Sequence, residues 1–362
     1  MLCKPSKLFF LFCKLSMLQV LSAQRLPDTV YYNLNDFWTV KKIDAHVHVR
    51  TNDPAFLLLS RKCNFRLLTI TTDEPPGIDN QNDYARHQMK LFPDILAYAT
   101  TFSVNEWTAD DWQSRAILKL KQSFSEGAAA VKVYKNIGME LRDKNGNHVM
   151  IDNPRFDSVI NYITSQKKTI IGHLGEPRNC WLPIDEMSIN SDKRYFSRHP
   201  EYHMYLHSEY PAYEDQLKAR DAMLIKHPEL KFVGAHLGSL EWSLEEMSKH
   251  LDRFPNDALD MAARLSHLEL HAKMNWKKTR EFIIKYQDRL LYGTDRIIDE
   301  QGEDKQMEER VTKSWVNDWK FFTTSEVMES AAFEGTFKGL KLPRKVIDKI
   351  YRLNAEKYFT WK

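Results

Sequence analysis

The stretch Lys42-Ile-Asp-Ala-His-Val-His-Val49 is an apolar run that carries His46 and His48 two positions apart. Such a run predicts a buried strand, and because strand side chains alternate with a period of two, both imidazoles should point to the same side. Two imidazoles on one face provide half of a metal site, since imidazole is a usual ligand of zinc and similar metals. The alternative is a pair of strand histidines that only share a face.

Outward from this stretch, short apolar runs alternate with amphipathic helical patterns through most of the chain. The predicted strands cover residues 43–49, 65–72, 94–104, 128–134, 169–173, 232–236, 259–263 and 290–293. The predicted helices include residues 111–125, 155–165, 213–226, 240–254 and 276–286, and a last helix covers residues 343–359. Most of the strands lack polar alternation, which is typical of a parallel sheet covered by helices. Eight such units predict an α/β fold, a single closed (β/α)₈ TIM barrel.

One connection is exceptionally long. About forty residues with little regular pattern lie between His173 and the helix that starts near Tyr213. Structureless connections beyond ~12–15 residues are uncommon in compact domains and are often lids or binding loops. Because this one follows the fifth strand, it should lie like a lid at the face of the barrel that carries active sites. A surface insertion without function is the alternative.

Polar residues stand at the ends of three further strands. His173 ends the fifth strand, His236 ends the sixth, and Asp295 follows the eighth. On a closed barrel these groups and the two histidines of the first strand converge at one mouth. Each alone also has a structural interpretation, such as a hydrogen-bonded histidine or, for Asp295, a helix N-cap. Together they predict a metal centre with nitrogen and oxygen ligands.

These residues stand in motifs that resemble those of the amidohydrolase superfamily, in its amidohydrolase-related branch, over nearly the whole chain after the leader. The motifs are Asp44-Ala-His-Val-His48, Gly172-His-Leu-Gly-Glu-Pro177, Gly234-Ala-His-Leu-Gly-Ser239, Tyr292-Gly-Thr-Asp295 and Ile350-Tyr-Arg-Leu-Asn-Ala355. The resemblance implies one or two divalent metal ions, with zinc the expected metal, bound by His46, His48, His173 and Asp295. It implies that His236 binds a second metal or polarises the substrate.

The expected chemistry is attack of metal-activated water on a carbonyl, because a bound metal lowers the pKa of water to ~7 and polarises the carbonyl. Asp295 would take the proton of this water and pass it to the leaving group. Lys132 alternates with valines that should face the helices, so it should point into the barrel, where burial favours the neutral amine. In two-metal members of the superfamily a lysine of this kind is carboxylated and bridges the metals. A substrate-binding, ion-paired or structural lysine is the alternative.

The sequence also contains candidates for substrate binding. Arg264 follows the seventh predicted strand, and its planar fork suits a carboxylate, with a structural salt bridge as the alternative. Arg178, Glu176 and His207 lie in the long connection, where ordinary solvated side chains are the alternative. We therefore predict a hydrolase of an amide, lactone or ester in a small, carboxylate-bearing substrate. The alternatives are a decarboxylase or hydratase that uses the same site, and a non-catalytic exported barrel that binds a ligand.

The first 23 residues form a leader. Lys4 and Lys7 precede an apolar run that ends at Leu21-Ser-Ala23, which predicts a signal peptide and export to the periplasm or the medium. The barrel domain then covers residues 24–362. The chain has 52 Lys and Arg against 49 Asp and Glu, and the leader contributes three of the lysines, so the remainder is neutral and shows no nucleic-acid footprint.

Two further properties follow from composition. No stretch approaches the ~20 apolar residues that cross a bilayer, so we expect no membrane association after removal of the leader. A homo-oligomer is compatible with the sequence. Of the four cysteines only Cys63 and Cys180 lie outside the leader, and the sequence leaves open whether they pair.

Overall fold

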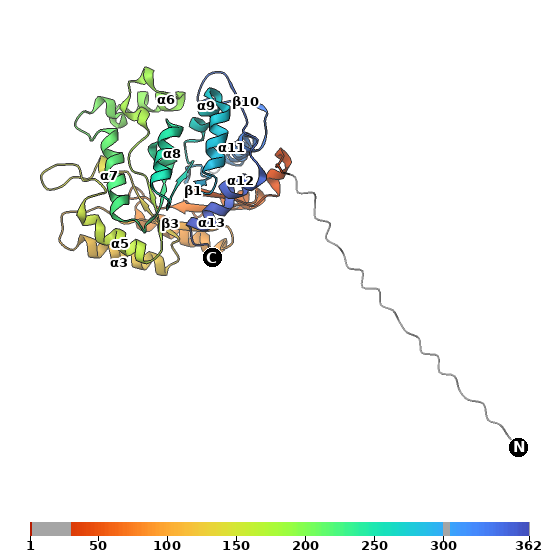
Figure 1. Ribbon diagram of the computed structural model, residues 1–362. Coiled ribbons are helices and arrows are strands. Elements are labelled where there is room, and N and C mark those ends of the chain that lie inside the picture. Colours follow the sequence, from red (N-terminus) through yellow and green to blue (C-terminus); the bar gives the residue numbers. More distant parts are fainter. Residues whose placement is uncertain (2–29, 300–304, 362) are drawn as a thin grey trace.

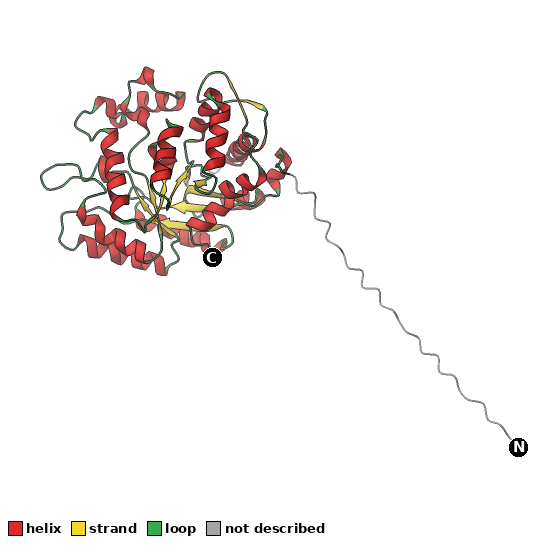
Figure 2. Ribbon diagram, in the orientation of Figure 1, coloured by secondary structure: helices red, strands yellow, loops and turns green. Residues whose placement is uncertain are grey.

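The computed structural model describes Met1 and residues 30–299 and 305–361, so the predicted signal peptide lies, apart from Met1, outside the described residues. Nine parallel strands form one sheet in the order β8-β7-β6-β5-β4-β3-β2-β1-β9. Their bounds are β1 Lys42–Arg50, β2 Phe65–Ile70, β3 Leu96–Thr100, β4 Ala130–Val133, β5 Thr169–Gly172, β6 Lys231–Gly234, β7 Asp257–Asp260, β8 Leu290–Leu291 and β9 Arg296–Asp299. Figure 2 shows the strands at the centre of the molecule with helices around them.

The sheet closes into a barrel because its two edge strands are consecutive in the chain. β8 pairs with β7, and β9 pairs with β1. Two backbone hydrogen bonds join β1 to the residues between β8 and β9. The amide of Ala45 donates to the carbonyl of Tyr292 (3.0 Å), and the amide of Asp295 donates to the carbonyl of His46 (2.8 Å). The predicted (β/α)₈ barrel is therefore confirmed, with its eighth strand divided into two pieces.

The division of the eighth strand has a steric cause. A Cβ atom on Gly293 would lie 2.9 Å from the Cβ of His46, so the chain approaches β1 more closely than any side chain there allows. Asp295 then adopts a φ of 63°, in the left-handed region that few non-glycine residues occupy. The predicted strand 290–293 is therefore too long at its end, since β8 stops at Leu291. The break turns Asp295 toward the barrel mouth.

The seventh strand also differs from the prediction. It covers Asp257–Asp260, whereas residues 259–263 were predicted. Acidic residues at both ends hide the strand from a hydrophobic pattern, because buried carboxylates are rare unless they are paired. Here each lies beside an imidazole: Asp257 is 3.2 Å from His250, and Asp260 forms a hydrogen bond of 2.9 Å with His46.

The helices that surround the barrel include every helical segment predicted from the sequence. α7 has the predicted bounds, whereas the last predicted helix consists of two α-helices joined by a π-helical turn, Lys349–Leu353. The helices are α1 Ala55–Lys62, α2 Ile78–Leu91, α3 Trp112–Ser125, α4 Asn136–Met139, α5 Asp157–Ser165, α6 Asn190–Arg198, α7 Tyr213–Lys226, α8 Leu244–Arg253, α9 Leu265–Met274, α10 Trp276–Lys285, α11 Lys305–Thr323, α12 Arg344–Asp348 and α13 Asn354–Tyr358. A short antiparallel pair, β10 Val327–Glu329 and β11 Thr336–Lys338, follows α11.

The connection after β5 is more ordered than predicted. It contains α6 and four short 3₁₀ turns, and it has a small apolar core formed by Cys180, Met187, Phe196 and Met204 together with Met139. Within the connection these apolar residues stand seven to nine positions apart, at 180, 187, 196 and 204, so they form no helical or strand periodicity. Cys180 and Cys63 are both buried and unpaired. Figure 1 shows the α6 region at the opposite side of the molecule from α13.

The barrel interior is apolar at the end where the strands begin, and the last residues of the chain cover that end. Ile43, Ala45 and Ala97 lie in one cluster with Tyr358 and Phe359. Thr169, the first residue of β5, donates a hydrogen bond to the carbonyl of Tyr358. The final helix therefore closes the bottom of the barrel and leaves the opposite mouth as the place for polar groups.

We expect the substitution Phe359→Ala to lower the free energy of unfolding by about 3–5 kcal/mol, because it leaves a cavity beneath the barrel. Phe359 is buried, whereas Leu353 on the preceding turn is 40% exposed and serves as the control through Leu353→Ala. Urea unfolding followed by circular dichroism measures both variants. Equal midpoints for the two would show that the C-terminal helix does not stabilise the barrel.

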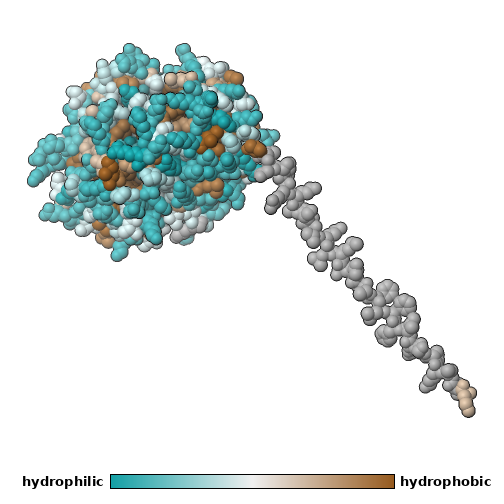
Figure 3. Space-filling view, in the orientation of Figure 1, coloured by the Kyte–Doolittle hydropathy of each residue, from teal (hydrophilic) through white to brown (hydrophobic). Residues whose placement is uncertain are grey.

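Two further observations concern the surface. Among the described residues, no helix is long and apolar enough to span a membrane. The face seen in Figure 3 is mostly hydrophilic, with separate apolar patches.

Candidate metal centre at the barrel mouth

Three predicted ligands converge where the strands end. His46 and His48 come from β1, and Asp295 comes from the break between β8 and β9. The Nε2 atoms of His46 and His48 lie 3.3 and 3.2 Å from the same oxygen, Oδ1 of Asp295. One ligand atom from each residue lies within 4.8 Å of the other two, the spacing of a group that could hold a metal ion.

A bulge in β1 directs the two histidines inward. Before the bulge, Ile43 and Ala45 face the barrel interior. The register between β1 and β2 shifts between Asp44 and Val47. After this shift, Val47 packs outward against the helices. His46 and His48 therefore share the inward face, as the period of two predicts. In a regular strand, side chains alternate, so the inward side chain of Ile43 would leave His46 and His48 facing outward, toward the helices. The bulge reverses this alternation.

Hydrogen bonds fix both imidazole rings. Nδ1 of His46 donates to Oδ2 of Asp260 at 2.9 Å, and Nδ1 of His48 donates to the carbonyl of Ile70 at 2.8 Å. With Nδ1 protonated, the neutral ring presents an unprotonated Nε2 toward Asp295. Metal-binding histidines are characteristically held in this way by a carboxylate or carbonyl behind the ring.

Asp260 is a functional residue that the sequence interpretation missed. Its Oδ2 accepts from His46, and its Oδ1 accepts from the backbone amides of His236 and Ala262, at 2.9 and 3.1 Å. Although His46, His236 and Asp260 form a second close group, these bonds occupy the Asp260 oxygens. Asp260 orients the site rather than offering a ligand atom. The sequence clue is a single acid in the apolar run Ala258-Leu-Asp-Met261.

His236 lies beside this cluster in a strained turn. It and Leu237 have φ of 58° and 57°, left-handed values that cost roughly 1–2 kcal/mol each for non-glycine residues. Its Nδ1 donates to the carbonyl of Ala262 (2.9 Å), so Nε2 is unprotonated in the neutral ring. Burial, and then the neighbouring His173, hold the pKa of His236 well below its usual range.

His173, the fourth predicted ligand, lies next to the cluster but outside its tightest group. Its ring centroid is 4.3 Å from that of His236, and its Nε2 is buried without a hydrogen-bond partner. The nearest acid is Glu176, whose Oε2 is 3.6 Å away and whose carboxylate forms an ion pair with Lys135. Burial lowers the pKa of His173 to about 4, so its imidazole is neutral at pH 7.

Lys132 points into the barrel, as its alternation with Val131 and Val133 predicts. It is buried, and its Nζ lies 3.4 Å from Nε2 of His46. Burial lowers the pKa of Lys132 to about 8, although the carboxylates of Asp260 and Asp295 oppose this shift. The neutral amine is therefore more accessible than in an exposed lysine, although the ammonium form still predominates at pH 7.

Asp295 is not a helix N-cap, because a strand, β9, follows it. Burial alone would raise the pKa of Asp295, but the attraction of the imidazoles of His236, His48 and His46 in their protonated form outweighs burial and lowers this pKa well below its usual range. Asp44, buried behind the site, fixes this part of the chain. It accepts hydrogen bonds from the amide and hydroxyl of Thr294 (3.0 and 2.7 Å) and from the indole of Trp315 (3.3 Å).

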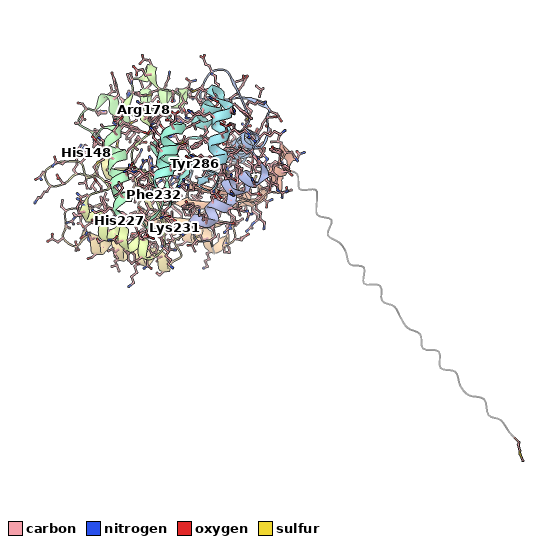
Figure 4. The ribbon with its side chains drawn as sticks, viewed as in Figure 1. His148, Arg178, His227, Lys231, Phe232 and Tyr286 are labelled. Atoms are coloured by element: carbon pink, nitrogen blue, oxygen red, sulfur yellow. The ribbon has the colours of Figure 1, made fainter. Side chains whose placement is uncertain are left out.

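Of the predicted substrate-binding residues, Glu176 lies beside His173, whereas Arg178, Arg264 and His207 make their contacts with other residues. Arg178 stacks on Trp242, with 4.2 Å between the guanidinium carbon and the ring centroid, and Figure 4 places it above the strands, opposite Lys231 at the start of β6. Arg264 occupies the N-cap position of α9 without a capping hydrogen bond from its side chain, and its NH1 group donates to the carbonyl of Ala263 at 3.0 Å. His207 contacts Pro200 and Glu209 within its own connection.

Arg50 is a second residue that the sequence interpretation missed. It follows His46 and His48 on the inward face of β1 and forms an ion pair with Glu74. The other oxygen of Glu74 accepts from the hydroxyl of Tyr134 at 2.6 Å, and the Tyr134 ring is 6.1 Å from that of His173. The period of two in β1 would have identified Arg50.

We expect Asp260→Asn to weaken metal binding by about 10–100-fold, the usual effect of removing the group behind a metal-binding histidine. The matched control is Asp257→Asn, which removes the other carboxylate–imidazole pair of β7, at the far end of the strand. Competition with a chromogenic chelator measures the affinity of each purified variant. An unchanged affinity in Asp260→Asn would contradict the orienting role.

The fold and this cluster define a (β/α)₈ barrel with a candidate metal site at the mouth formed by its strand ends. The comparison of sequences adds that the family model described as amidohydrolase matches residues 201–361. The resemblance to the amidohydrolase superfamily is therefore confirmed. A search of curated proteins gives no match.

Solved structures extend the likeness to most of the chain. An amidohydrolase II is 15% identical with a TM-score of 0.52, over 88% of this chain and 99% of that one. The 2,6-dihydroxybenzoate decarboxylase from Rhizobium is 13% identical with a TM-score of 0.51, over 88% and 98%. A 2,6-dihydroxybenzoate decarboxylase in complex with 2,6-dihydroxybenzoate is 14% identical with a TM-score of 0.51, over 88% and 98%. At these identities the likeness shows the fold alone.

Proposed function

We propose that this protein is a metal-dependent hydrolase that acts on an amide, lactone or ester carbonyl at the barrel mouth. One observation carries the proposal: two Nε2 atoms and a carboxylate oxygen converge, and each imidazole is held by a hydrogen bond at its other nitrogen. Three such ligands that leave a position open are the usual arrangement of a catalytic zinc site.

The residues present fit a divalent metal ion. His46, His48 and Asp295 would hold it, and the unpartnered Nε2 of His173 makes this residue the fourth candidate ligand. Nitrogen and oxygen donors without a thiolate suit zinc, which we propose as the metal. When bound, such an ion supplies Lewis acidity to a substrate carbonyl and to water.

The residues around the ligands can move the protons of a hydrolysis. The Asp295 carboxylate stays ionised and can accept a proton from the attacking water, then deliver it to the leaving group. His236 presents its unprotonated Nε2 at the same mouth as a second acceptor. Lys132, next to His46, can hold substrate as an ammonium or, as a neutral amine, be carboxylated and bridge a second metal.

We propose a small substrate with a carboxylate. Arg178 and Arg264 supply guanidinium groups from two of the connections at the strand ends, and Arg50 supplies a third on the inward face of β1. A planar guanidinium binds a carboxylate with two parallel hydrogen bonds. We also propose that residues 1–23 are a signal peptide that directs export, and that residues 24–362 form a single domain.

Decarboxylation is the second candidate function. It is favoured by the fold shared with 2,6-dihydroxybenzoate decarboxylase, whose name identifies an aromatic carboxylate as its substrate. The same ligands would stabilise negative charge on a substrate oxygen, but the reaction needs a proton donor to carbon. Because Nε2 of neutral His236 is a proton acceptor, the hydrolase is the better fit.

Product analysis of the purified, metal-loaded protein distinguishes the two functions. We would incubate it with a panel of N-acyl amino acids, lactones and hydroxybenzoates, and measure released acid and carbon dioxide separately. Cleavage without carbon dioxide is expected. Release of carbon dioxide from a hydroxybenzoate would show that the protein is a lyase and not a hydrolase. If no substrate of either class were turned over in a reaction that His46→Ala abolishes, both proposals would be contradicted.

A further inference from the structure

A cavity lies at the opposite end of the barrel from the candidate metal site. Its volume is about 410 Å³, within the range of small-molecule sites. Its lining residues come from the start of β2, the last turns of α2, the α2–β3 connection with the start of β3, the α3–β4 connection, and Thr360 and Trp361. Arg66, in the lining, is four residues from Ile70, whose carbonyl holds His48. At ~3.3 Å per residue the two ends of this strand are about 13 Å apart.

One wall of the cavity is apolar. Met89, Ile95, Leu96, Ala97 and the ring of Trp361 form it. Trp361 is held in place by a hydrogen bond from its indole nitrogen to the carbonyl of Ala355 (3.1 Å) and packs against the apolar cluster at the bottom of the barrel. Its ring is therefore a fixed surface on which a flat, apolar group can lie.

The other wall is positively charged. Arg66 stacks on Trp361, with 4.3 Å between the guanidinium carbon and the ring centroid, and its Nε is buried without a hydrogen-bond partner. Its ion pair with Glu356 is 3.4 Å long, and Arg352 approaches the same carboxylate at 3.1 Å. Two guanidinium groups thus share one acid, and the Arg66 guanidinium keeps hydrogen-bonding capacity for another anion.

Two further cations line this wall. Arg86 is neutralised by Asp83 and Glu126, with which it forms ion pairs. Lys90 is exposed and forms no ion pair with the described residues. The wall as a whole therefore carries more positive charge than its acids compensate, immediately beside the apolar surface.

We propose that this cavity is a second ligand site, which binds a small aromatic or branched aliphatic carboxylate. The carboxylate pairs with Arg66 and Lys90, and the apolar body lies against Trp361 and the residues of the α2–β3 connection. A planar guanidinium that is already stacked on an aromatic ring is pre-organised for a carboxylate, which favours this anion over a compact one. The site is separate from the proposed function and does not depend on the metal.

The test uses 4-fluorobenzoate as the probe and ¹⁹F NMR titration of the full-length, metal-loaded protein as the measurement. We expect saturable binding that Arg66→Met and Trp361→Ala each weaken at least tenfold, and that the exposed variant Lys90→Met weakens severalfold. Arg61→Met is the matched control: Arg61 is an exposed arginine paired with Asp94, outside the cavity, and its loss should leave binding unchanged.

A further variant separates this site from the metal centre, which could itself bind a carboxylate. His46→Ala should retain the probe. Loss of binding in His46→Ala with retention in Arg66→Met would overturn the proposal, as would absence of saturable binding in the unmodified protein. Displacement of the probe by an equal concentration of inorganic phosphate would also overturn it, because the site would then recognise charge alone.

Discussion

The substitution Asp295→Asn is expected to lower turnover by about 10³–10⁴-fold while the protein stays folded. The amide cannot accept the proton of the attacking water, and general acid–base catalysis contributes roughly 10²–10⁴-fold by itself. The amide also replaces the ionised oxygen that lies 3.2–3.3 Å from both Nε2 atoms, which weakens the metal site in addition.

Steady-state kinetics on the substrate found in the product screen measures this effect, with circular dichroism as the check on folding. Asp288→Asn is the matched control. Asp288 is an exposed acid that lies just before β8, away from the mouth, and forms an ion pair with Lys349. Full activity of Asp295→Asn would exclude the proton transfer assigned to this residue.

The substitution His46→Ala is expected to remove bound metal and to lower turnover by about 10³-fold or more. A metal ion contributes several kcal/mol of charge stabilisation in the transition state, and each 1.36 kcal/mol corresponds to a factor of ten. His46 connects the three parts of the centre, because its Nε2 lies near Asp295 and Lys132 and its Nδ1 is bound by Asp260.

Metal content by inductively coupled plasma mass spectrometry, together with kinetics, measures the result. His87→Ala, an exposed histidine on α2, is the control and should keep both metal and activity. If His46→Ala bound metal with the stoichiometry of the unmodified protein, the centre would have to be assigned to other residues. Anomalous scattering from crystals of the metal-loaded protein would count the ions and show whether Lys132 bridges two of them.

The identity of the cluster could be predicted before its geometry. His46, His48, His173, His236 and Asp295 each end or follow an apolar run, and the rule that parallel strands end at one mouth brings them together without any knowledge of side-chain contacts. The inward direction of Lys132 could likewise be predicted, because it alternates with Val131 and Val133 along its strand. What this rule does not give is which of them come closest, and the tightest group leaves His173 beside the cluster.

Two acids around the site could not be assigned their role from the sequence. Asp260 and Asp44 lie inside buried strands, where a hydrophobic pattern predicts no acid, and residues distant in the chain help to satisfy their oxygens. Asp260 is 214 positions from its partner His46, and Asp44 is 271 positions from Trp315. Partners this distant along the chain cannot be identified from local patterns.

The sequence by itself determined the barrel, its mouth and the kinds of side chain gathered there, because strand periodicity and strand ends are local properties. Only the tertiary structure decided the direction of the key side chains. The bulge after Asp44 changes which residues of β1 face inward, and the close approach of Gly293 to His46 breaks the eighth strand and turns Asp295 into the site. The bulge lies in the pairing of β1 with β2, and the break arises where β1 packs against a segment roughly 250 residues later, so neither follows from the local pattern of one strand.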